Sequence, residues 1–281
     1  MRSWRDNMLT VSGPGIPGTE VETWYLEAFC RKGSTHRKWD ETVIPHTTRL
    51  ISQREDKTRI ELESTVEGGV KVSHDIRARD DTVTFDLVIA NTTNKPVDIE
   101  WAQPCVRVGK FTGGDENEYI EKCFIFTERG PTMLDKARRT EKAIYEGGQV
   151  YVPRGIDRDD VNPRPLSPDV PVNNLIGCVS EDGKWLLATA WDETQELFQG
   201  IITCIHADFR IGGLAPGETK RVRGVLYVMP NDIDALLKRY QAYFLGGRRA
   251  LVRFRLGISS LQRFRNRVQE RLSFERLGEG V

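Results

Sequence analysis

Short segments that alternate between apolar and polar residues recur along most of this chain. Three of them follow one another directly, at Arg59–Thr65, Val70–Ile76 and Thr82–Ala90, and polar turns join them. Such alternation places every second side chain on one face, which is typical of a half-buried antiparallel strand. A chain made of many such segments buries their apolar faces by packing two sheets together or by closing one sheet. The pattern therefore predicts an all-β fold.

We expect about ten strands in all, the last of them ending before residue 231. Besides the three above, they cover Val21–Cys30, Ile99–Val108, Tyr119–Thr127, Leu175–Ser180, Trp185–Trp191, Gln199–Gly213 and Lys220–Met229. Residues 1–20 and 31–46 are expected to be irregular, and 132–146 to contain helical turns. Residues 1–230 are thus predicted to form an antiparallel β-sandwich, of a jelly-roll or supersandwich-like kind.

A helix is predicted after the last strand, as a C-terminal helical extension. Asn231 is a good N-cap, and the acidic residues that follow suit the positive end of the helix dipole. Gly246 and Gly247 end this helix, and Arg248–Arg276 form a basic tail with apolar residues at helical spacing. We expect residues 231–281 to pack on the sandwich or on a second subunit, which would give a homo-oligomer. Contact with an acidic partner or a membrane surface is less favoured, because the apolar face is short and interrupted.

Composition narrows the class of protein. The chain has 281 residues with 41 basic and 41 acidic side chains, so its net charge of zero disfavours a nucleic-acid binder. The N-terminus lacks an apolar run like that of a signal peptide, and no apolar stretch is long enough to span a bilayer. The five cysteines form no Cys-x-x-Cys motif and are expected to be reduced thiols. We therefore expect a cytoplasmic protein without a membrane span.

The strand around residue 206 carries an unusual polar row. Cys204, His206, Asp208 and Arg210 alternate with apolar residues, so they share one face. His206 is a candidate general acid or base oriented by Asp208, with Arg210 as an anion or hydroxyl clamp. No cofactor is required by this hypothesis, but a divalent metal on Cys204, His206 and Asp208 is an alternative. The simplest alternative is a structural thiol and a His–Asp pair on a solvated face.

A second row lies on the strand around residue 104. Trp101, Gln103, Cys105 and Arg107 share one face of it, and Pro104 indicates an edge or a bulge. An indole beside amide and guanidinium groups suits a sugar ring, since the indole stacks and the planar donors bind hydroxyls. Arg107 would equally hold a carboxylate in bidentate fashion. Alternatively, Trp101 only covers the sheet.

Further candidate residues lie in loops. Pro153–Pro171 is long and stiffened by prolines, so Arg154 and Arg164, together with His46, could form a lid over the two rows. Trp191 ends a strand, and the acidic residues after it, including Glu196, could serve glycoside hydrolysis. Surface ion pairs and solvated acids are the simpler explanation of both groups. P-loop, G-x-S-x-G and H-E-x-x-H motifs are absent from the sequence.

Several stretches resemble a family of bacterial β-sandwich proteins that has no established activity. They are Trp24–Ser34, Ile44–Thr48, Trp101–Arg107, Asp160–Pro168, Gln195–Gly200 and Cys204–Gly213. The resemblance covers roughly residues 20–244 and leaves out the basic tail. It implies one domain and assigns no catalytic residue. The family is common in bacteria rich in polysaccharide-degrading enzymes, which favours carbohydrate chemistry.

These observations together favour a carbohydrate-active enzyme of the glycoside hydrolase or lyase type, acting on a sugar or a uronic acid. His206, Asp208 and Arg210 would be catalytic, and the other candidates would bind the substrate, which is a small molecule or an oligosaccharide. One alternative is a non-catalytic carbohydrate-binding module or assembly subunit. Another is a metal-dependent, cupin-like enzyme.

Overall fold

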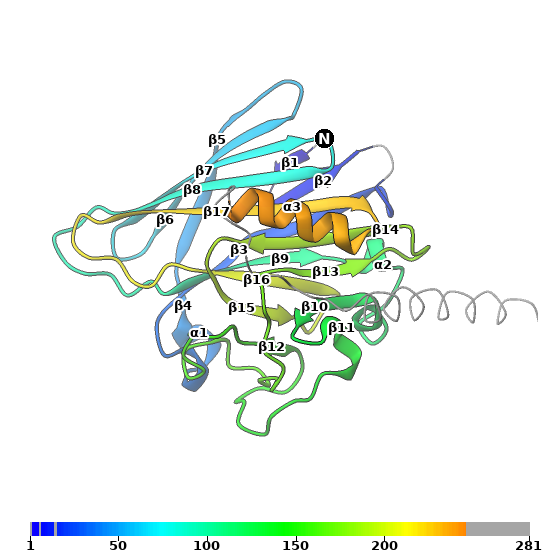
Figure 1. Ribbon diagram of the computed structural model, residues 1–281. Helices are drawn as coiled ribbons and strands as arrows, with labels where there is room; N and C mark the ends of the chain where they lie inside the picture. The colour runs from blue at the N-terminus through cyan, green and yellow to red at the C-terminus, as the bar shows by residue number, and fades with distance from the viewer. Residues whose placement is uncertain (1, 6, 14–15, 246–281) are drawn as a thin grey trace, which may run out of the picture.

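The computed structural model describes residues 2–5, 7–13 and 16–245. Two antiparallel sheets pack face to face, and one longer helix lies on the outside (Figure 1). Every strand pairing within the two sheets is antiparallel. This confirms the predicted antiparallel β-sandwich.

We call the eight-stranded sheet, which carries both polar rows, sheet A. In spatial order it contains β1 (Arg2–Arg5), β2 (Met8–Ser12), β3 (Glu20–Cys30), β9 (Trp101–Arg107), β16 (Cys204–Arg210), β15 (Thr194–Gln199) and β12 (Gln149–Tyr151), and the short β4 (Val43–Ile44) pairs with β3. β9 and β16 are therefore neighbours at the centre of sheet A, although about a hundred residues separate them in sequence.

Sheet B has nine strands. In order they are β11 (Gly130–Met133), β10 (Cys123–Thr127), β13 (Ile176–Val179), β14 (Trp185–Trp191), β17 (Thr219–Pro230), β8 (Thr82–Asn91), β7 (Val70–Arg79), β6 (Arg59–Val66) and β5 (His46–Gln53). The short helices α1 (Trp39–Thr42) and α2 (Gly109–Thr112) and three single 3₁₀ turns, at Ser34–His36, Tyr119–Lys122 and Leu134–Lys136, complete the described part.

The main core lies between the two sheets. Phe209 of β16 packs on Trp191 of β14 with ring centroids 4.4 Å apart, and Trp191 packs on Phe85 of β8 at 5.4 Å. Burial of such large rings is the main source of stability in a sandwich. Trp191, which we expected at a substrate site, is thus part of this core and only 1% exposed.

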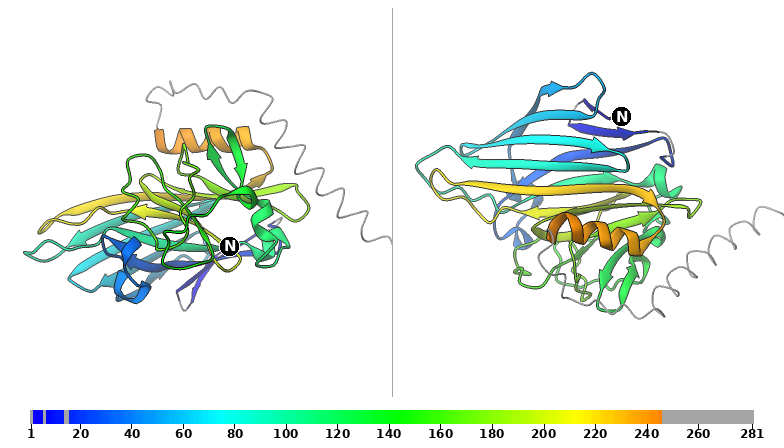
Figure 2. Two further views of the ribbon diagram at one scale, coloured as in Figure 1. Left: turned by 90° about the horizontal axis from the view of Figure 1, so that it is seen from below. Right: turned by 45° about the horizontal axis from the view of Figure 1, so that its top comes forward.

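The helix α3 (Ile233–Leu245) covers the outer face of sheet B, as Figures 1 and 2 show. Ile233 and Leu236 are buried there in a second apolar cluster with residues of β10, β13, β14 and β17. The predicted helix is confirmed, but its first turn differs: Asp232 Oδ1 accepts hydrogen bonds from the backbone N–H groups of residues 234 and 235. Asn231 instead donates to the carbonyl of Gly183.

Seven strands lie in segments that were expected to be irregular or helical, or that were assigned to no element. β1 and β2 occupy the N-terminal lead-in, β4 lies within residues 31–46, and β5, β11, β12 and β15 were missed as well. β5 is an edge strand with a mostly exposed, polar face, and all six residues of β15 are buried, so neither shows alternating hydropathy. The expected helical turns at 132–146 reduce to the 3₁₀ turn at Leu134–Lys136.

The basic tail at Arg248–Arg276 lies outside the described residues. Among those described, no helix combines the length and the apolar character that a membrane crossing requires.

Candidate functional site

The two polar rows meet on the outer face of sheet A, the face turned away from sheet B. In β16, Ile205, Ala207 and Phe209 belong to the inter-sheet core, so the side chains between them point to the other face. β9 divides in the same way, with Ala102 and Val106 in the core. Gln103 Nε2 lies 2.9 Å from Nδ1 of His206, which joins the two rows directly.

The rows do not form an open, solvated face. His206 and Asp208 are 1% and 0% exposed, and Gln103 is also buried. The backbone around Val161 and Asn162 hydrogen-bonds to this face and to the segment after β3: Asn162 N–H donates to Glu196, and Ser34 Oγ donates to the carbonyl of Val161. Part of the Pro153–Pro171 loop, residues 160–162, therefore does lie over the rows and is held there by hydrogen bonds. We call these three residues the cover.

Both nitrogens of His206 are occupied by protein groups. Nδ1 faces Gln103, as described, and Nε2 lies 3.2 Å from Cys204 Sγ. The ring also packs on Phe198, with centroids 5.0 Å apart. Asp208 Oδ1 is 3.7 Å from Nδ1, which is longer than a hydrogen bond. Gln103, rather than Asp208 as expected, thus orients the imidazole.

Asp208 instead forms a pair with Glu196, the residue directly opposite it on β15. The two carboxyl groups lie across this pairing from each other and are fully buried. Asp208 Oδ1 and Oδ2 and Glu196 Oε1 have no hydrogen-bond donor among the described residues, whereas Glu196 Oε2 accepts the N–H of Asn162 at 2.8 Å. Ionised carboxylates only accept hydrogen bonds, so two buried carboxyl groups with so few donors favour holding a proton between them.

The electrostatics of the pair follow from its burial. Burial raises the pKa of Glu196 to about 8, although the N–H of Asn162 opposes this shift. Burial, and then the charge of Glu196, also raise the pKa of Asp208 well above its usual range. A carboxyl pair of this kind keeps a proton near neutral pH and titrates as a unit.

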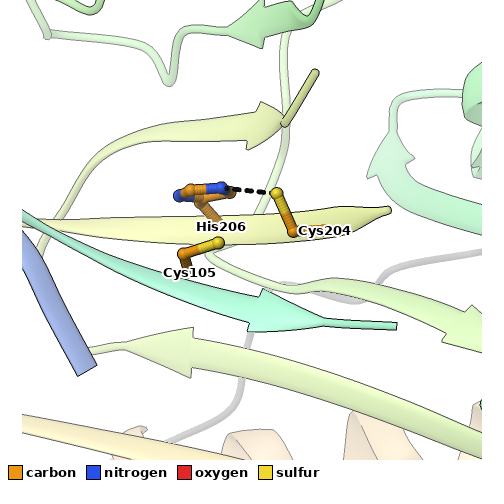
Figure 3. Close-up of side chains that lie close together, drawn as sticks. All are labelled: Cys105, Cys204 and His206. Atoms are coloured by element: carbon orange, nitrogen blue, oxygen red, sulfur yellow. Dashed lines mark hydrogen bonds between the residues drawn. The ribbon is translucent and has the colours of Figure 1, made fainter. Parts of the chain in front are cut away.

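Two thiols lie beside the imidazole (Figure 3). Cys105 of β9 and Cys204 of β16 point toward His206, and the three donor atoms all lie within 4.8 Å of one another. All three residues are buried. The neighbouring thiol of Cys204 and burial together raise the pKa of Cys105 above its usual range. Cys105 was noted only as a neighbour in the second row, so its role in this cluster was missed in the sequence.

Arg210 and Trp101 lie at the other end of the face. Both belong to hydrogen-bond networks that hold the cover in place. Arg210 donates to Gln195 Oε1 at 2.6 Å and forms an ion pair with Glu100. Gln195 Nε2 in turn donates to the carbonyl of Asp160. Trp101 Nε1 donates to Ser34 Oγ at 3.1 Å, and its ring is 0% exposed. Trp101 therefore offers no free surface to a sugar in this structure.

The remaining predicted substrate residues lie away from the cluster. Arg154 is exposed and pairs with Glu128. Arg164 donates to the carbonyl of Glu146 and stacks over Tyr145, 4.9 Å from the ring centroid.

His46 lies at the junction of the two sheets. Its Nε2 is 3.0 Å from the carbonyl oxygen of Leu26, and its ring packs edge-on against Phe29. The structure thus does not bring His46, Arg154 and Arg164 together as a lid.

Trp24 is an aromatic residue on the outer face that retains exposed surface. It lies opposite Cys105 across the β3–β9 pairing, and Tyr25 beside it points into the core, so Trp24 shares the outer face with the cluster. Its side chain is 37% exposed. Glu22 lies opposite Arg107 on the same face, and both are half-buried. The alternating pattern of β3 could have indicated this face for Trp24.

No protein-family model and no curated protein sequence matches this chain. Solved structures with a similar course of the chain include Slr1438 from Synechocystis sp. PCC 6803, with 8% identity and a TM-score of 0.43 over 82% of this chain and 95% of that one. A galactose mutarotase-like protein from Lactobacillus casei has 8% identity and a TM-score of 0.44, covering 81% and 99%. A quadruple mutant of the α-N-acetylgalactosaminidase NagBb from Bifidobacterium bifidum has 9% identity and a TM-score of 0.44, covering 86% and 38%.

Proposed function

We propose that the protein is a carbohydrate-active enzyme that carries out acid/base chemistry at the Glu196–Asp208 pair. The observation that supports this most is the pair itself: two buried carboxyl groups opposite each other on adjacent strands, with an imidazole 3.7 Å from one of them. A pair that holds one proton can donate it or, once ionised, accept one, which is what a general acid or base must do near neutral pH. Strongly shifted carboxyl groups of this kind are typical of functional sites.

The geometry favours proton abstraction or donation at one sugar carbon over hydrolysis by two flanking carboxylates. Hydrolysis needs its carboxyl groups about 5 Å or more apart, on the two sides of the scissile bond. Glu196 and Asp208 instead lie directly opposite each other on the adjacent strands β15 and β16, on one face of the sheet, and do not face each other across a gap. A lyase-type reaction on a uronic acid therefore fits the pair better than a glycoside hydrolase reaction.

His206 and Arg210 take supporting roles in this proposal. Both nitrogens of His206 are bound by protein groups, so it lines the site and does not transfer protons to a substrate. Arg210 positions Gln195, which bonds to the cover at Asp160. Glu196 thus replaces His206 as the group that exchanges the proton, with Asp208 as its partner.

The substrate class is inferred from the accessible part of the same face. Trp24 supplies an aromatic ring on which the apolar face of a sugar can stack, and Arg107 supplies a guanidinium for a carboxylate or for hydroxyls. The pair itself is buried, so the segment around Asn162 must withdraw before a substrate carbon can reach Glu196. Closure over the bound sugar would then exclude water.

A panel of sugars tests this proposal. Uronate-containing polysaccharides are assayed for unsaturated products by ultraviolet absorbance, neutral polysaccharides for new reducing ends, and free aldoses for anomer exchange by NMR. We expect turnover of the uronate-containing polysaccharides. Glu196→Gln should abolish this turnover, and Glu67→Gln, a change in an exposed turn, should leave it intact. Binding that Trp24→Ala abolishes, without turnover by any variant, would show a non-catalytic module and refute the enzyme proposal.

A further inference from the structure

We propose that Cys105, Cys204 and His206 bind one zinc ion. This site goes beyond the sugar chemistry above and does not depend on it, since neither carboxyl group of the pair is among the proposed ligands. The donor atoms are Sγ of the two cysteines and Nε2 of the histidine, which come from the adjacent strands β9 and β16 (Figure 3).

The spacing of the donor atoms suits a tetrahedral ion. Zinc holds sulfur at about 2.3 Å and nitrogen at about 2.0 Å, so tetrahedral ligands lie about 3.3–3.8 Å apart. Here Cys204 Sγ and His206 Nε2 are 3.2 Å apart, and all three donor atoms lie within 4.8 Å of one another. Small side-chain rotations would therefore close the set around one ion.

The ligand types and the burial favour zinc over a harder cation. Two thiolates are soft donors and a neutral imidazole is a borderline one, and among the described residues no carboxylate belongs to this group of donor atoms, since Asp208 lies toward Nδ1. Two thiolates also cancel the charge of Zn²⁺. A neutral complex can be buried at much lower cost than an isolated charge, and all three residues are buried.

Gln103 meets the requirement that a metal-bound histidine has a partner on its other nitrogen. A histidine that binds metal through Nε2 carries its proton on Nδ1 and donates it to an acceptor. Gln103 lies at Nδ1, and its Oε1 is buried without a partner among the described residues. Turning the amide over places Oε1 against the Nδ1 proton, since the two orientations differ only in which atom is oxygen; the N–H₂ group then takes the position that Oε1 held.

Gly200 leaves the space that the thiol occupies. A Cβ at this position would lie 2.2 Å from Cys204 Sγ and 3.2 Å from His206 Nε2. Its backbone is anchored by Tyr119, whose hydroxyl donates to the carbonyl of Gly200 at 2.6 Å. Since residue 200 does not have a positive φ, the glycine is required here by the close approach of the donor atoms and not by backbone conformation.

This set differs from the one expected from the sequence. Cys204 and His206 are retained, but Cys105 replaces Asp208. Asp208 is engaged with Glu196 and lies on the Nδ1 side of the ring, away from Cys204. Three protein ligands leave a fourth position of the ion for water or a substrate atom, as in catalytic zinc sites.

Metal analysis of the full-length protein tests the site. The protein is purified without a histidine tag under reducing conditions, loaded with zinc, passed through a desalting column and analysed by mass spectrometry of the metals. We expect one zinc per chain in the wild type and in Cys178→Ala, which removes a buried thiol of sheet B. We expect at least a tenfold lower zinc content in Cys105→Ser and Cys204→Ser. Wild-type protein without zinc, or Cys105→Ser with a full equivalent, would overturn the proposal.

Cobalt substitution provides a readout that misfolding alone would not mimic. Cobalt bound by two thiolates gives a charge-transfer absorption. In Cys105→Ser, loaded at a cobalt concentration high enough to fill the site, one thiolate remains, so this absorption should fall by about half and should not disappear. An absorption equal to that of the wild type would exclude Cys105 as a ligand. One equivalent of iron or copper in place of zinc would overturn the choice of metal.

Glu196→Gln separates the two proposals. It should keep the full equivalent of zinc while losing the sugar turnover proposed above. Turnover that depends on Glu196 in a protein without zinc would reject the metal site only, and zinc without any turnover would reject the sugar chemistry only.

Discussion

Replacing Glu196 by Gln should stabilise the protein, and by an amount that grows with pH. Glutamine keeps an oxygen for the N–H of Asn162 and adds an N–H₂ group that can donate to Asp208, so the shape and the contacts of the pair are retained. What changes is the proton that the folded wild type must hold. Burial raises the pKa of Glu196 from 4.5 to about 8, so between these values the unfolded chain has released a proton that the folded chain keeps.

The sign follows from proton linkage. Where the folded state binds more protons than the unfolded state, stability falls as pH rises, by about 1.4 kcal/mol per pH unit for one proton. Between pH 5 and pH 7 the wild type should therefore lose about 3 kcal/mol relative to Glu196→Gln. Below the ordinary pKa of a glutamate the two proteins should be about equally stable, and above pH 8 the difference should stop growing.

Urea unfolding followed by tryptophan fluorescence at pH 5, 6, 7 and 8 measures this difference. Glu67→Gln, in an exposed turn, is the matched control and should follow the wild type at every pH. Parallel pH profiles for the wild type and Glu196→Gln would refute the shared-proton account. A constant loss of stability in the variant would show that Glu196 is buried as a charged group with hydrogen-bond donors around it.

Three further predictions concern residues outside the carboxyl pair. Burial lowers the pKa of His74 to about 3. As pH falls from 6 to 4, the wild type should therefore lose up to about 1.4 kcal/mol of unfolding free energy per pH unit relative to His74→Asn. The same urea titrations measure this difference, and parallel profiles would contradict it. Gly224→Ala should cost about 1–3 kcal/mol, because the added Cβ would lie 2.5 Å from the ring of Trp191; an unchanged midpoint of thermal unfolding would contradict it. Trp24→Ala should weaken binding of the substrate that the panel identifies, as measured by calorimetry. It should shift the midpoint of thermal unfolding little, since the ring of Trp24 is partly exposed. Unchanged affinity would show that Trp24 is not part of the binding surface.

Local patterning allowed much of the fold to be predicted. Strands such as β6, β7 and β8 have one buried and one solvated face, so their hydropathy alternates with period two. β15 could not be found in this way, because both of its faces are covered and its polar residues are buried with the apolar ones. Glu196 was therefore considered as an acid in a loop, and its pairing with Asp208 depends on a strand that the pattern does not reveal.

The alternation of β9 and β16 predicted which side chains share a face, but not whether that face is open. The cover comes from residues around Val161, which bond to Ser34 and Thr35 more than a hundred positions earlier in the chain. Such long-range pairing leaves no local signal. The same reason explains why Trp101, chosen from its row, is buried, whereas Trp24 on the same face keeps exposed surface.

The central claim is that Glu196 exchanges a proton with a sugar substrate. It is tested most directly by the ratio of kcat/KM for Glu196→Gln and for the wild type, on the substrate that the panel identifies, with both proteins shown to be folded. Loss of a general acid or base should lower kcat/KM by about 10² to 10⁴. A ratio within a factor of about three of unity would contradict the claim, because a group that transfers a proton in the transition state cannot be removed at so small an effect.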